Sequence, residues 1–316
     1  MRLLKTATCE VTEAKDIPSP FPHYAILSHT WISPRDEITY QDTRTRMADI
    51  KDDLFKQKGW SKIKSFCTRA KADGWEWAWM DTCCIDKTST GDTQEAINAM
   101  FRWYQDAGVC YAYLPDVDAG GLEAIGGHSD PSGPHYARLK ESFIKANWFT
   151  RGWTLQELLA PHYLMFVDRH WHHIGTRESW ALEIKEACNI DSRHLVDFKP
   201  TEPTSCSIAM KLSWASRRET TVEEDEAYSL LGLFGISLPL IYGEGRSRAF
   251  SRFQRELILT YNDDSIFAWK AERPSAEQLP HLNWTGLLPL QKNIWLFIID
   301  PHLQNQIPDR GSLHAQ

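Results

Sequence analysis

Over residues 22–114, short apolar runs alternate with stretches of helical periodicity. Each apolar run has the length of a buried strand, and each stretch between them has the length of a helix. Strands are predicted at residues 22–28, 76–81 and 109–114, and helices at about 61–73 and 93–107. This alternation is typical of a parallel α/β sheet flanked by helices. Such sheets bind their ligands beyond the carboxyl ends of the strands.

The pattern continues to about residue 176 and then changes. A loop rich in Gly, Asp, Pro and Ser is expected at 116–135, a short helix at 153–159 and a fourth strand at 163–167. Helices are expected after that, at about 177–188, 222–233 and 246–260. The sequence therefore predicts an α/β domain over residues 1–175 and a mainly helical domain over residues 176–316. The helices should pack on the first domain and bury Trp214, Tyr228, Leu231 and Phe234.

Charge and composition argue against several classes of partner. The 316 residues carry 35 basic and 42 acidic side chains, a net charge of −7, whereas binding to a nucleic-acid backbone needs a basic surface. No apolar stretch reaches the ~18 residues of a membrane span. The N-terminal residues also lack the apolar run of a secretory signal. Seven scattered cysteines, an odd number, indicate reduced thiols and a cytoplasmic protein.

Polar side chains follow the first two predicted strands. Ser28, His29 and Trp31 stand at the carboxyl end of the first strand, and Asp81 stands at the exit of the second. A parallel sheet holds its ligand at this edge, so these residues are candidates for a binding site. A strand-end turn with Trp31 folded over the sheet edge explains the first group equally well.

Two further groups could carry chemistry, and each has a simpler explanation. Cys83 and Cys84 could supply a catalytic thiol with His29 as the base, but buried thiols packed beneath the loop are favoured. His170 and His172 could share one face of a strand and ligate a metal. No Cys-x-x-Cys pair or His-Glu-x-x-His sequence accompanies them, so a solvated strand end is favoured and no metal site is predicted.

Residues 151–158, Arg-Gly-Trp-Thr-Leu-Gln-Glu-Leu, allow two interpretations. Thr154 and Glu157 have the spacing of a capping box, which would commit the Glu157 carboxylate to its own helix. In the other interpretation, Glu157 lies beside Trp153 on the wall of a cleft. Spacing alone favours the capping box.

Four motifs, in order, resemble those of the fungal heterokaryon-incompatibility (HET) domain over roughly residues 24–175. They are Tyr24-Ala-Ile-Leu-Ser-His-Thr-Trp31, Trp79-Met-Asp-Thr-Cys-Cys-Ile-Asp86, Glu95-Ala-Ile-Asn98 with Met100-Phe-Arg-Trp-Tyr104, and Arg151-Gly-Trp-Thr-Leu-Gln-Glu-Leu-Leu-Ala-Pro161. Residues 212–245 resemble the helical segment that often follows this domain. The resemblance implies a role in non-self recognition and regulated cell death after cell fusion.

HET domains in turn resemble Toll/interleukin-1 receptor (TIR) domains, which implies a flavodoxin-like sheet and a mechanism. In TIR enzymes a glutamate in a Trp-Cys-x-x-Glu-Leu helix cleaves NAD. Here Trp153-Thr-Leu-Gln-Glu157-Leu158 has the same Trp-to-Glu spacing, with Thr154 in place of Cys. The resemblance also implies that residues 82–92 occupy the position of the mobile loop that gates TIR sites. Residues 28–31 depart from the TIR pattern.

A single carboxylate suits the reaction that the resemblance implies. Cleavage of the nicotinamide–ribose bond expels a neutral pyridine and leaves an oxocarbenium-like centre, which one carboxylate can stabilise. NAD or a related nucleotide is then the substrate, and no separate cofactor is expected. We expect Glu157 to be catalytic and the site to be lined by Ser28, His29, Trp31, Asp81, Arg151 and Trp153. Many TIR domains only scaffold, so self-association, or recruitment of another incompatibility protein, is the alternative.

Overall fold

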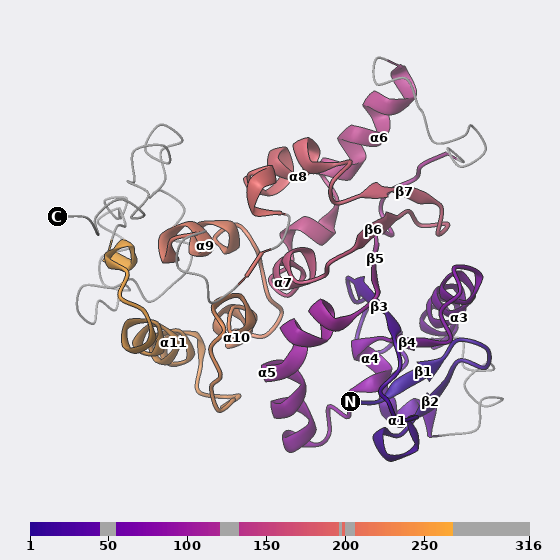
Figure 1. The fold of residues 1–316 in the computed structure, drawn as a ribbon, viewed down its shortest axis with the longest axis horizontal. Coiled ribbons are helices and arrows are strands. Elements are labelled where there is room, and N and C mark those ends of the chain that lie inside the picture. Colours follow the sequence, from indigo (N-terminus) through magenta and orange to yellow (C-terminus); the bar gives the residue numbers. More distant parts are fainter. Residues whose placement is uncertain (45–54, 121–132, 196–197, 200–205, 268–316) are drawn as a thin grey trace.

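The computed structural model describes residues 1–44, 55–120, 133–195, 198–199 and 206–267, and it contains a seven-stranded sheet flanked by helices (Figure 1). The strand order is β2-β1-β4-β3-β5-β6-β7. The central strands are β3 (Tyr24–His29), β4 (Trp77–Trp79), β5 (Val109–Tyr113) and β6 (Leu164–Val167), and they pair in parallel. The alternation in the sequence predicts all four, and their parallel pairing confirms the α/β class.

The order of the parallel strands creates a switch point at the carboxyl edge of the sheet. β3 pairs with β4 on one side and with β5 on the other. The chain from β3 to β4 contains α3 (Gln57–Ala72), and the chain from β4 to β5 contains α5 (Thr90–Asp106); they cover opposite faces (Figure 1). Open sheets of this kind bind ligands where the connections diverge, which here is between the carboxyl ends of β3 and β5.

Antiparallel strands at both edges make the sheet mixed, which corrects the expectation of a purely parallel one. β1 (Leu3–Lys5) and β2 (Glu10–Thr12) form a hairpin in which β1 also pairs with β4. At the other edge, β7 (His173–Thr176) pairs with β6. These three strands lie outside the strand–helix alternation by which the sequence marks the central strands.

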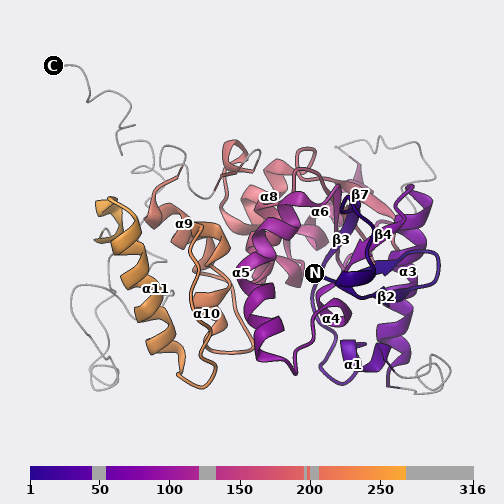
Figure 2. The ribbon, with the colours of Figure 1, turned by 60° about the horizontal axis from the view of Figure 1, so that its bottom comes forward.

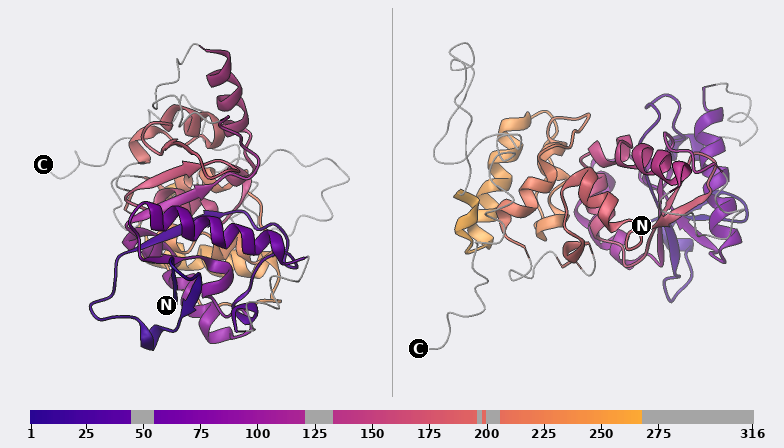
Figure 3. Two further views of the ribbon diagram at one scale, coloured as in Figure 1. Left: turned by 90° about the vertical axis from the view of Figure 1, so that its right-hand side faces the viewer. Right: turned by 90° about the horizontal axis from the view of Figure 1, so that it is seen from above.

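Helices cover both faces of the sheet. The left panel of Figure 3 shows α3 lying across one face. On the opposite face, α5 lies beside α7 (Thr154–Leu159), which packs against β3. The α5 stripe of Ile97, Met100, Phe101 and Tyr104 is buried, as its spacing predicts. Shorter helices complete this part of the chain: η1 (Ala14–Asp16), α1 (Tyr40–Thr43), α4 (Asp81–Cys84), α6 (Pro134–Ile144) and η3 (Asn147–Thr150).

Beyond β7 the described residues are mainly helical, and α5 lies between the sheet and the helices α9, α10 and α11 (Figure 2). The described helices beyond β7 are α8 (Ala181–Cys188), η4 (Ser192–His194), α9 (Ile208–Ala215), α10 (Asp225–Tyr228), η5 (Gly232–Phe234), α11 (Arg246–Thr260) and η6 (Asp264–Phe267). The four side chains expected to be buried are buried: Trp214, Tyr228, Leu231 and Phe234. α9 lies outside the predicted helices.

Three sequence predictions reach beyond what the structure describes. The expected loop at 116–135 falls outside the described residues between 121 and 132, and the division into domains at residue 175 stays a prediction. The last part of the expected helical domain, residues 268–316, is also outside them. In the parts of the chain that are described, no helix has the length and apolar character to cross a membrane.

Candidate functional site

Two segments that are far apart in the sequence meet at the carboxyl edge of β3. Ser28 is the fifth residue of β3, and Glu157 lies in the first turn of α7. The Ser28 hydroxyl donates to Glu157 Oε2 at 2.5 Å, and the Trp148 indole N–H donates to Ser28 Oγ at 2.8 Å. The structure therefore brings Ser28 and Glu157 together and adds Trp148, a residue outside the sequence motifs.

Glu157 is buried, and its carboxyl group favours the protonated form. The side chain is 7% exposed. Burial raises the pKa of Glu157 to about 8; the hydrogen bond from Ser28 opposes this shift, and the charge of Asp81 adds to it. A carboxyl group that titrates near neutral pH is common where a side chain takes part in chemistry.

The first turn of α7 is not held by a capping box, so that interpretation of the spacing is wrong. The N-cap residue is Trp153, and no side chain caps the helix. Thr154 lies inside the helix, and its hydroxyl donates to the carbonyls of Trp148 at 2.5 Å and Arg151 at 2.9 Å. The Glu157 carboxyl group is therefore bonded to another element of the fold instead of its own helix.

Asp81, the first residue of α4, contacts the other polar groups at this edge of the sheet. Its Oδ1 lies 2.9 Å from His29 Nε2, and its Oδ2 accepts from the Trp31 indole at 2.9 Å and from the Lys87 ammonium at 3.3 Å. Burial acts to raise the pKa of Asp81, but Lys87, His29 and Trp31 outweigh it and hold the pKa well below its usual range. Asp81 is thus a fixed negative charge, whose field contributes to the raised pKa of Glu157.

A buried ion pair supports His29 from the side opposite Asp81. Lys62 Nζ lies 2.8 Å from His29 Nδ1 and forms an ion pair with Glu37. Both side chains are almost fully buried, and burial lowers the pKa of Lys62 although Glu37 opposes this. The sequence gives little sign of this support, because Lys62 lies on a helix whose apolar spacing alone draws attention.

The comparisons with known proteins bear on this part of the chain. Residues 24–157 match the family described as heterokaryon incompatibility protein (HET). This segment is therefore similar to a HET domain. The match begins at β3 and ends at Glu157, so it contains both halves of the Ser28–Glu157 contact.

One relative is similar over a longer stretch of the chain. The chain is 42% identical over 259 residues to the vegetative incompatibility protein HET-E-1 of Podospora anserina. The aligned region is 81% of this chain but 18% of that protein, so the chain spans about a fifth of the relative's length. No solved structure matches the chain.

Two expected site residues turn toward the C-terminal helices. The Arg151 guanidinium donates to Thr221 Oγ1 at 2.9 Å. The Trp153 indole donates to Asp225 Oδ2 at 3.0 Å. Neither makes a hydrogen bond to Glu157 among the contacts of the described residues. The structure therefore groups Ser28 with Glu157, and His29 and Trp31 with Asp81, but it places Arg151 and Trp153 at the junction with the helices.

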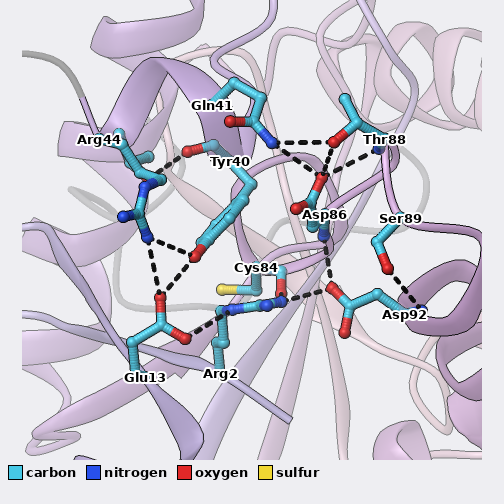
Figure 4. A network of polar contacts seen from close by, with 11 residues as sticks. Arg2, Glu13, Tyr40, Gln41, Arg44, Cys84, Asp86, Thr88, Ser89 and Asp92 are labelled. Atoms are coloured by element: carbon cyan, nitrogen blue, oxygen red, sulfur yellow. Dashed lines mark hydrogen bonds and ion pairs between the residues drawn. The ribbon is translucent and has the colours of Figure 1, made fainter.

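The segment expected to act as a gating loop, residues 82–92, is held by several hydrogen bonds (Figure 4). Residues 81–84 form α4 and α5 begins at Thr90, so the irregular part is only residues 85–89. Asp86 Oδ1 accepts from Gln41 Nε2 at 2.9 Å, and the Asp86 amide donates to Asp92 Oδ2 at 2.8 Å (Figure 4). Arg2 then donates to the same Asp92 oxygen at 2.5 Å (Figure 4).

The simpler explanations hold for the cysteines near Asp81. Cys83 and Cys84 are buried on α4. The neighbouring thiol of Cys84 and burial both raise the pKa of Cys83, so its reactive thiolate form is disfavoured. This is the packing role that the sequence favoured.

The histidines that follow β6 contact Asp168 and each other. His172 Nδ1 lies 3.3 Å from Asp168 Oδ2, and the rings of His170 and His172 are 5.7 Å apart. Throughout the described residues, no group of three or more His, Cys, Asp or Glu side chains is placed to hold a metal ion.

Proposed function

We propose that this chain acts as a cell-death effector of the heterokaryon-incompatibility type. The match of residues 24–157 to the HET family and the likeness to a vegetative incompatibility protein support this role. The partner that triggers it would be a second copy of the chain or another incompatibility protein.

For its activity we propose NAD hydrolysis at a TIR-like site centred on Glu157. The observation that carries the proposal is the Ser28–Glu157 contact at the carboxyl edge of β3. The Glu157 carboxyl group does not cap α7. Its contact with Ser28 also keeps it close to the switch point of the sheet, where open α/β sheets bind ligands. The order β4-β3-β5-β6 of the parallel strands also agrees with a flavodoxin-like arrangement.

The reaction would proceed through charge separation at the ribose. The bond between C1′ and the nicotinamide nitrogen breaks, the electron pair leaves with the neutral nicotinamide, and C1′ becomes oxocarbenium-like. The Glu157 carboxylate stabilises this positive charge, and Ser28 fixes the carboxylate by its hydrogen bond. Water then attacks C1′ and loses a proton to the carboxylate or to solvent, giving ADP-ribose.

The Asp81 group would serve binding. The Trp31 indole would stack on a flat ring of the substrate. The Lys87 ammonium lies 3.5 Å from the centre of the Trp31 ring and would bind a phosphate group of the substrate. NAD would be the substrate, and the reaction needs no further cofactor. A cationic nicotinamide beside Glu157 would also favour the ionised carboxylate that catalysis requires.

Glu157→Gln tests the enzymatic proposal. Glutamine keeps the acceptor for the Ser28 hydroxyl but removes the charge, so nicotinamide release from NAD should fall on the order of 10²–10³-fold. Glu95→Gln makes the same chemical change on an exposed part of α5 and should leave the rate unchanged. Glu95→Gln should melt near the wild-type temperature, and Glu157→Gln should melt at or above it. Cell killing and NAD loss should disappear together in Glu157→Gln, and killing that persists at the wild-type level refutes NAD hydrolysis as its cause.

A non-enzymatic signalling scaffold is the second candidate, and one observation favours it. Glu157 is 7% exposed with a pKa of about 8, so the unliganded carboxyl group is mostly uncharged at neutral pH. Next to Asp81, Trp31 and Ile32 are 39% and 44% exposed, a surface suited to self-association. On this alternative, Ile32→Ser abolishes killing and self-association, and Glu157→Gln leaves both intact.

A further inference from the structure

Arg218 is a buried cation at the junction between α7 and the C-terminal helices. Its side chain is 2% exposed, and it makes no ion pair within the described part of the chain. One nitrogen, Nη1, donates to Thr154 Oγ1 at 2.8 Å and to the Arg151 carbonyl at 2.9 Å. The other two, Nε and Nη2, are buried without a hydrogen-bond partner. Burial of an uncompensated charge is costly, so a site of this kind is incomplete without an anion.

A second buried arginine shows what a purely structural one looks like in this chain. Arg177 Nη1 donates to the carbonyls of Leu158 and Pro161 at 2.9 and 2.8 Å. Its Nη2 meets the Glu178 carboxylate at 3.4 Å. Arg177 thus has a carboxylate within ion-pair distance. The carboxyl group that acts on Arg218 is that of Glu157, and among the described residues it forms no ion pair with Arg218.

A cavity at Arg218 has the chemistry of an anion site. It lies where the end of α8 faces the end of α9, and its polar lining comes from Asn189, Ser213, Ser216, Arg217 and Arg218. Arg217 is exposed at this cavity. No aspartate or glutamate is among the described residues that line it. The Ser213 and Ser216 hydroxyls now donate to carbonyls within their own turn, at 2.7 Å each, and could turn toward a ligand.

We propose that this cavity is an oxyanion site for a phosphate group, either inorganic phosphate or a phosphate monoester. Two guanidinium groups match the double negative charge of a phosphate better than the single charge of a carboxylate. The free Nε and Nη2 of Arg218 form one edge of the guanidinium plane, the edge that binds two oxygens of one anion. Burial lowers the pKa of Arg218, and a bound dianion would reverse that shift.

The site would act on the segment that carries Glu157. Arg218 Nη1 holds the Arg151 carbonyl and Thr154, which begins α7. The next residue, Glu219, exchanges backbone hydrogen bonds with Thr150 at 2.6 Å and Gly152 at 2.8 Å. A phosphate on Arg218 therefore stabilises the connection between the C-terminal helices and α7, and this holds whether or not Glu157 cleaves NAD.

Thermal unfolding of the full chain with added inorganic phosphate tests the site. A ten-fold excess of phosphate over its Kd should raise the Tm by about 2–4 °C relative to chloride at equal ionic strength. Arg217→Ala should raise the Kd about ten-fold, because one charge-assisted bond is lost. Arg255→Ala, an exposed arginine on α11, should respond as wild type does. Equal responses from all three proteins, or none beyond chloride, overturn the proposal.

Arg218→Met removes the charge at similar volume and gives an independent test. It should melt at or above the wild-type temperature without phosphate, since a buried unpaired charge is lost, and it should no longer respond to phosphate. Should Arg218→Met fail to fold, protection of Cys188 from alkylation is the second readout, because this thiol also lines the cavity. Phosphate should slow modification of Cys188 in wild type and leave Cys9 unaffected, and unprotected Cys188 refutes the site. Ribose 5-phosphate should act as phosphate does if a monoester is the ligand, and acetate acting equally well contradicts the phosphate preference.

Discussion

Glu157 shows how one side chain can be polar, buried and satisfied at once. Its carboxyl group accepts the Ser28 hydroxyl at 2.5 Å, and Ser28 in turn accepts the Trp148 indole N–H. A protonated carboxyl group loses little on burial, whereas an ionised one loses much. The same carboxyl group thus costs the fold little when neutral, and it becomes a strong electrostatic partner when a cation approaches.

The stability of the protein should depend on pH through this group. The pKa of Glu157 is about 8 in the folded chain against an ordinary 4.5, so the native state keeps a proton that the unfolded chain releases. The stabilisation is complete below pH 4.5 and is lost as pH rises toward 8, by at most about 1.4 kcal/mol per pH unit. Because glutamine does not titrate, the unfolding free energy of wild type should fall relative to that of Glu157→Gln over this window. Denaturant titrations at several pH values measure the difference, and two parallel curves would show that the buried group is ionised.

Activity should depend on pH with the opposite sign. If the carboxylate form of Glu157 cleaves NAD, kcat/KM should increase with pH until about 8, because that parameter reports the free enzyme. Ser28 lowers the pKa of Glu157, so Ser28→Ala should move the midpoint of the profile to higher pH. Ser142→Ala, which removes a hydroxyl bonded within α6, should leave the midpoint in place. An unmoved midpoint in Ser28→Ala contradicts the role of this hydroxyl.

At the scale of elements, the connection between α4 and α5 depends on the first residues of the chain. Arg2 donates to Glu13 Oε2 at 3.1 Å, to Asp92 Oδ2 at 2.5 Å and to the Cys84 carbonyl at 3.3 Å (Figure 4). One side chain thus ties the β1–β2 hairpin to both ends of residues 85–89.

Arg2→Ala should therefore loosen this connection more than it destabilises the whole chain. The guanidinium is partly exposed, so we expect about 1 kcal/mol of lost stability. Hydrogen exchange of residues 85–89 should become markedly faster, because they pack few apolar side chains. Arg102→Ala, on the exposed side of α5, serves as the control. If exchange at 85–89 is the same in both variants, the Arg2 network does not hold the connection.

The elements that the sequence predicts well are those whose own residues determine them. β3 is buried at every position, and β5 at all but its last, so an apolar run alone identifies each. β1 and β7 escape prediction because β1 precedes and β7 follows the strand–helix alternation that marks the other strands. The capping box at 154–157 is wrong for a related reason. The local spacing is compatible with a capping box, but Thr154 forms hydrogen bonds with Trp148 and Arg218, and Glu157 forms one with Ser28. These contacts form only in the tertiary structure, so the spacing cannot predict them.

The candidate site follows the same rule. Parallel strands place their carboxyl ends at one edge, so residues next to strand ends, such as Ser28 and Asp81, are predictable as neighbours. Trp148 and Lys62 are not, because each lies on another element and reaches the site only through side-chain packing. Arg151 and Trp153 are expected at the site because they are close to Glu157 in the sequence. In the structure, however, their side chains turn toward the C-terminal helices.

At the scale of the whole molecule, the C-terminal helices and the sheet share one hydrophobic core. Buried side chains of the sheet, α5, α9, η5 and α11 belong to one continuous cluster. Backbone pairing of Glu219 with Thr150 and Gly152 adds a polar connection. The residues at the carboxyl edge of the sheet are therefore held in place by the strands and also by the helices that follow residue 176 in the chain.

Gly232→Ala tests this shared core at one point. Gly232 begins η5, and a Cβ there would lie 2.4 Å from Phe101 Cβ on α5 and 2.8 Å from Gln156 Oε1 on α7. Phe101 Cβ is fixed to the α5 backbone, so η5 itself would have to move, at a cost of about 1–3 kcal/mol. Chemical denaturation should show this loss.

Gly91→Ala is the matched control, because a Cβ at Gly91, in the first turn of α5, meets no atom within 4 Å. It should be neutral or up to about 1 kcal/mol more stable, since alanine favours helix. Equal stability of the two variants would mean that η5 does not pack on α5 and α7 at this distance. A loss in Gly232→Ala together with weaker activity at Glu157 would show that the C-terminal helices position α7.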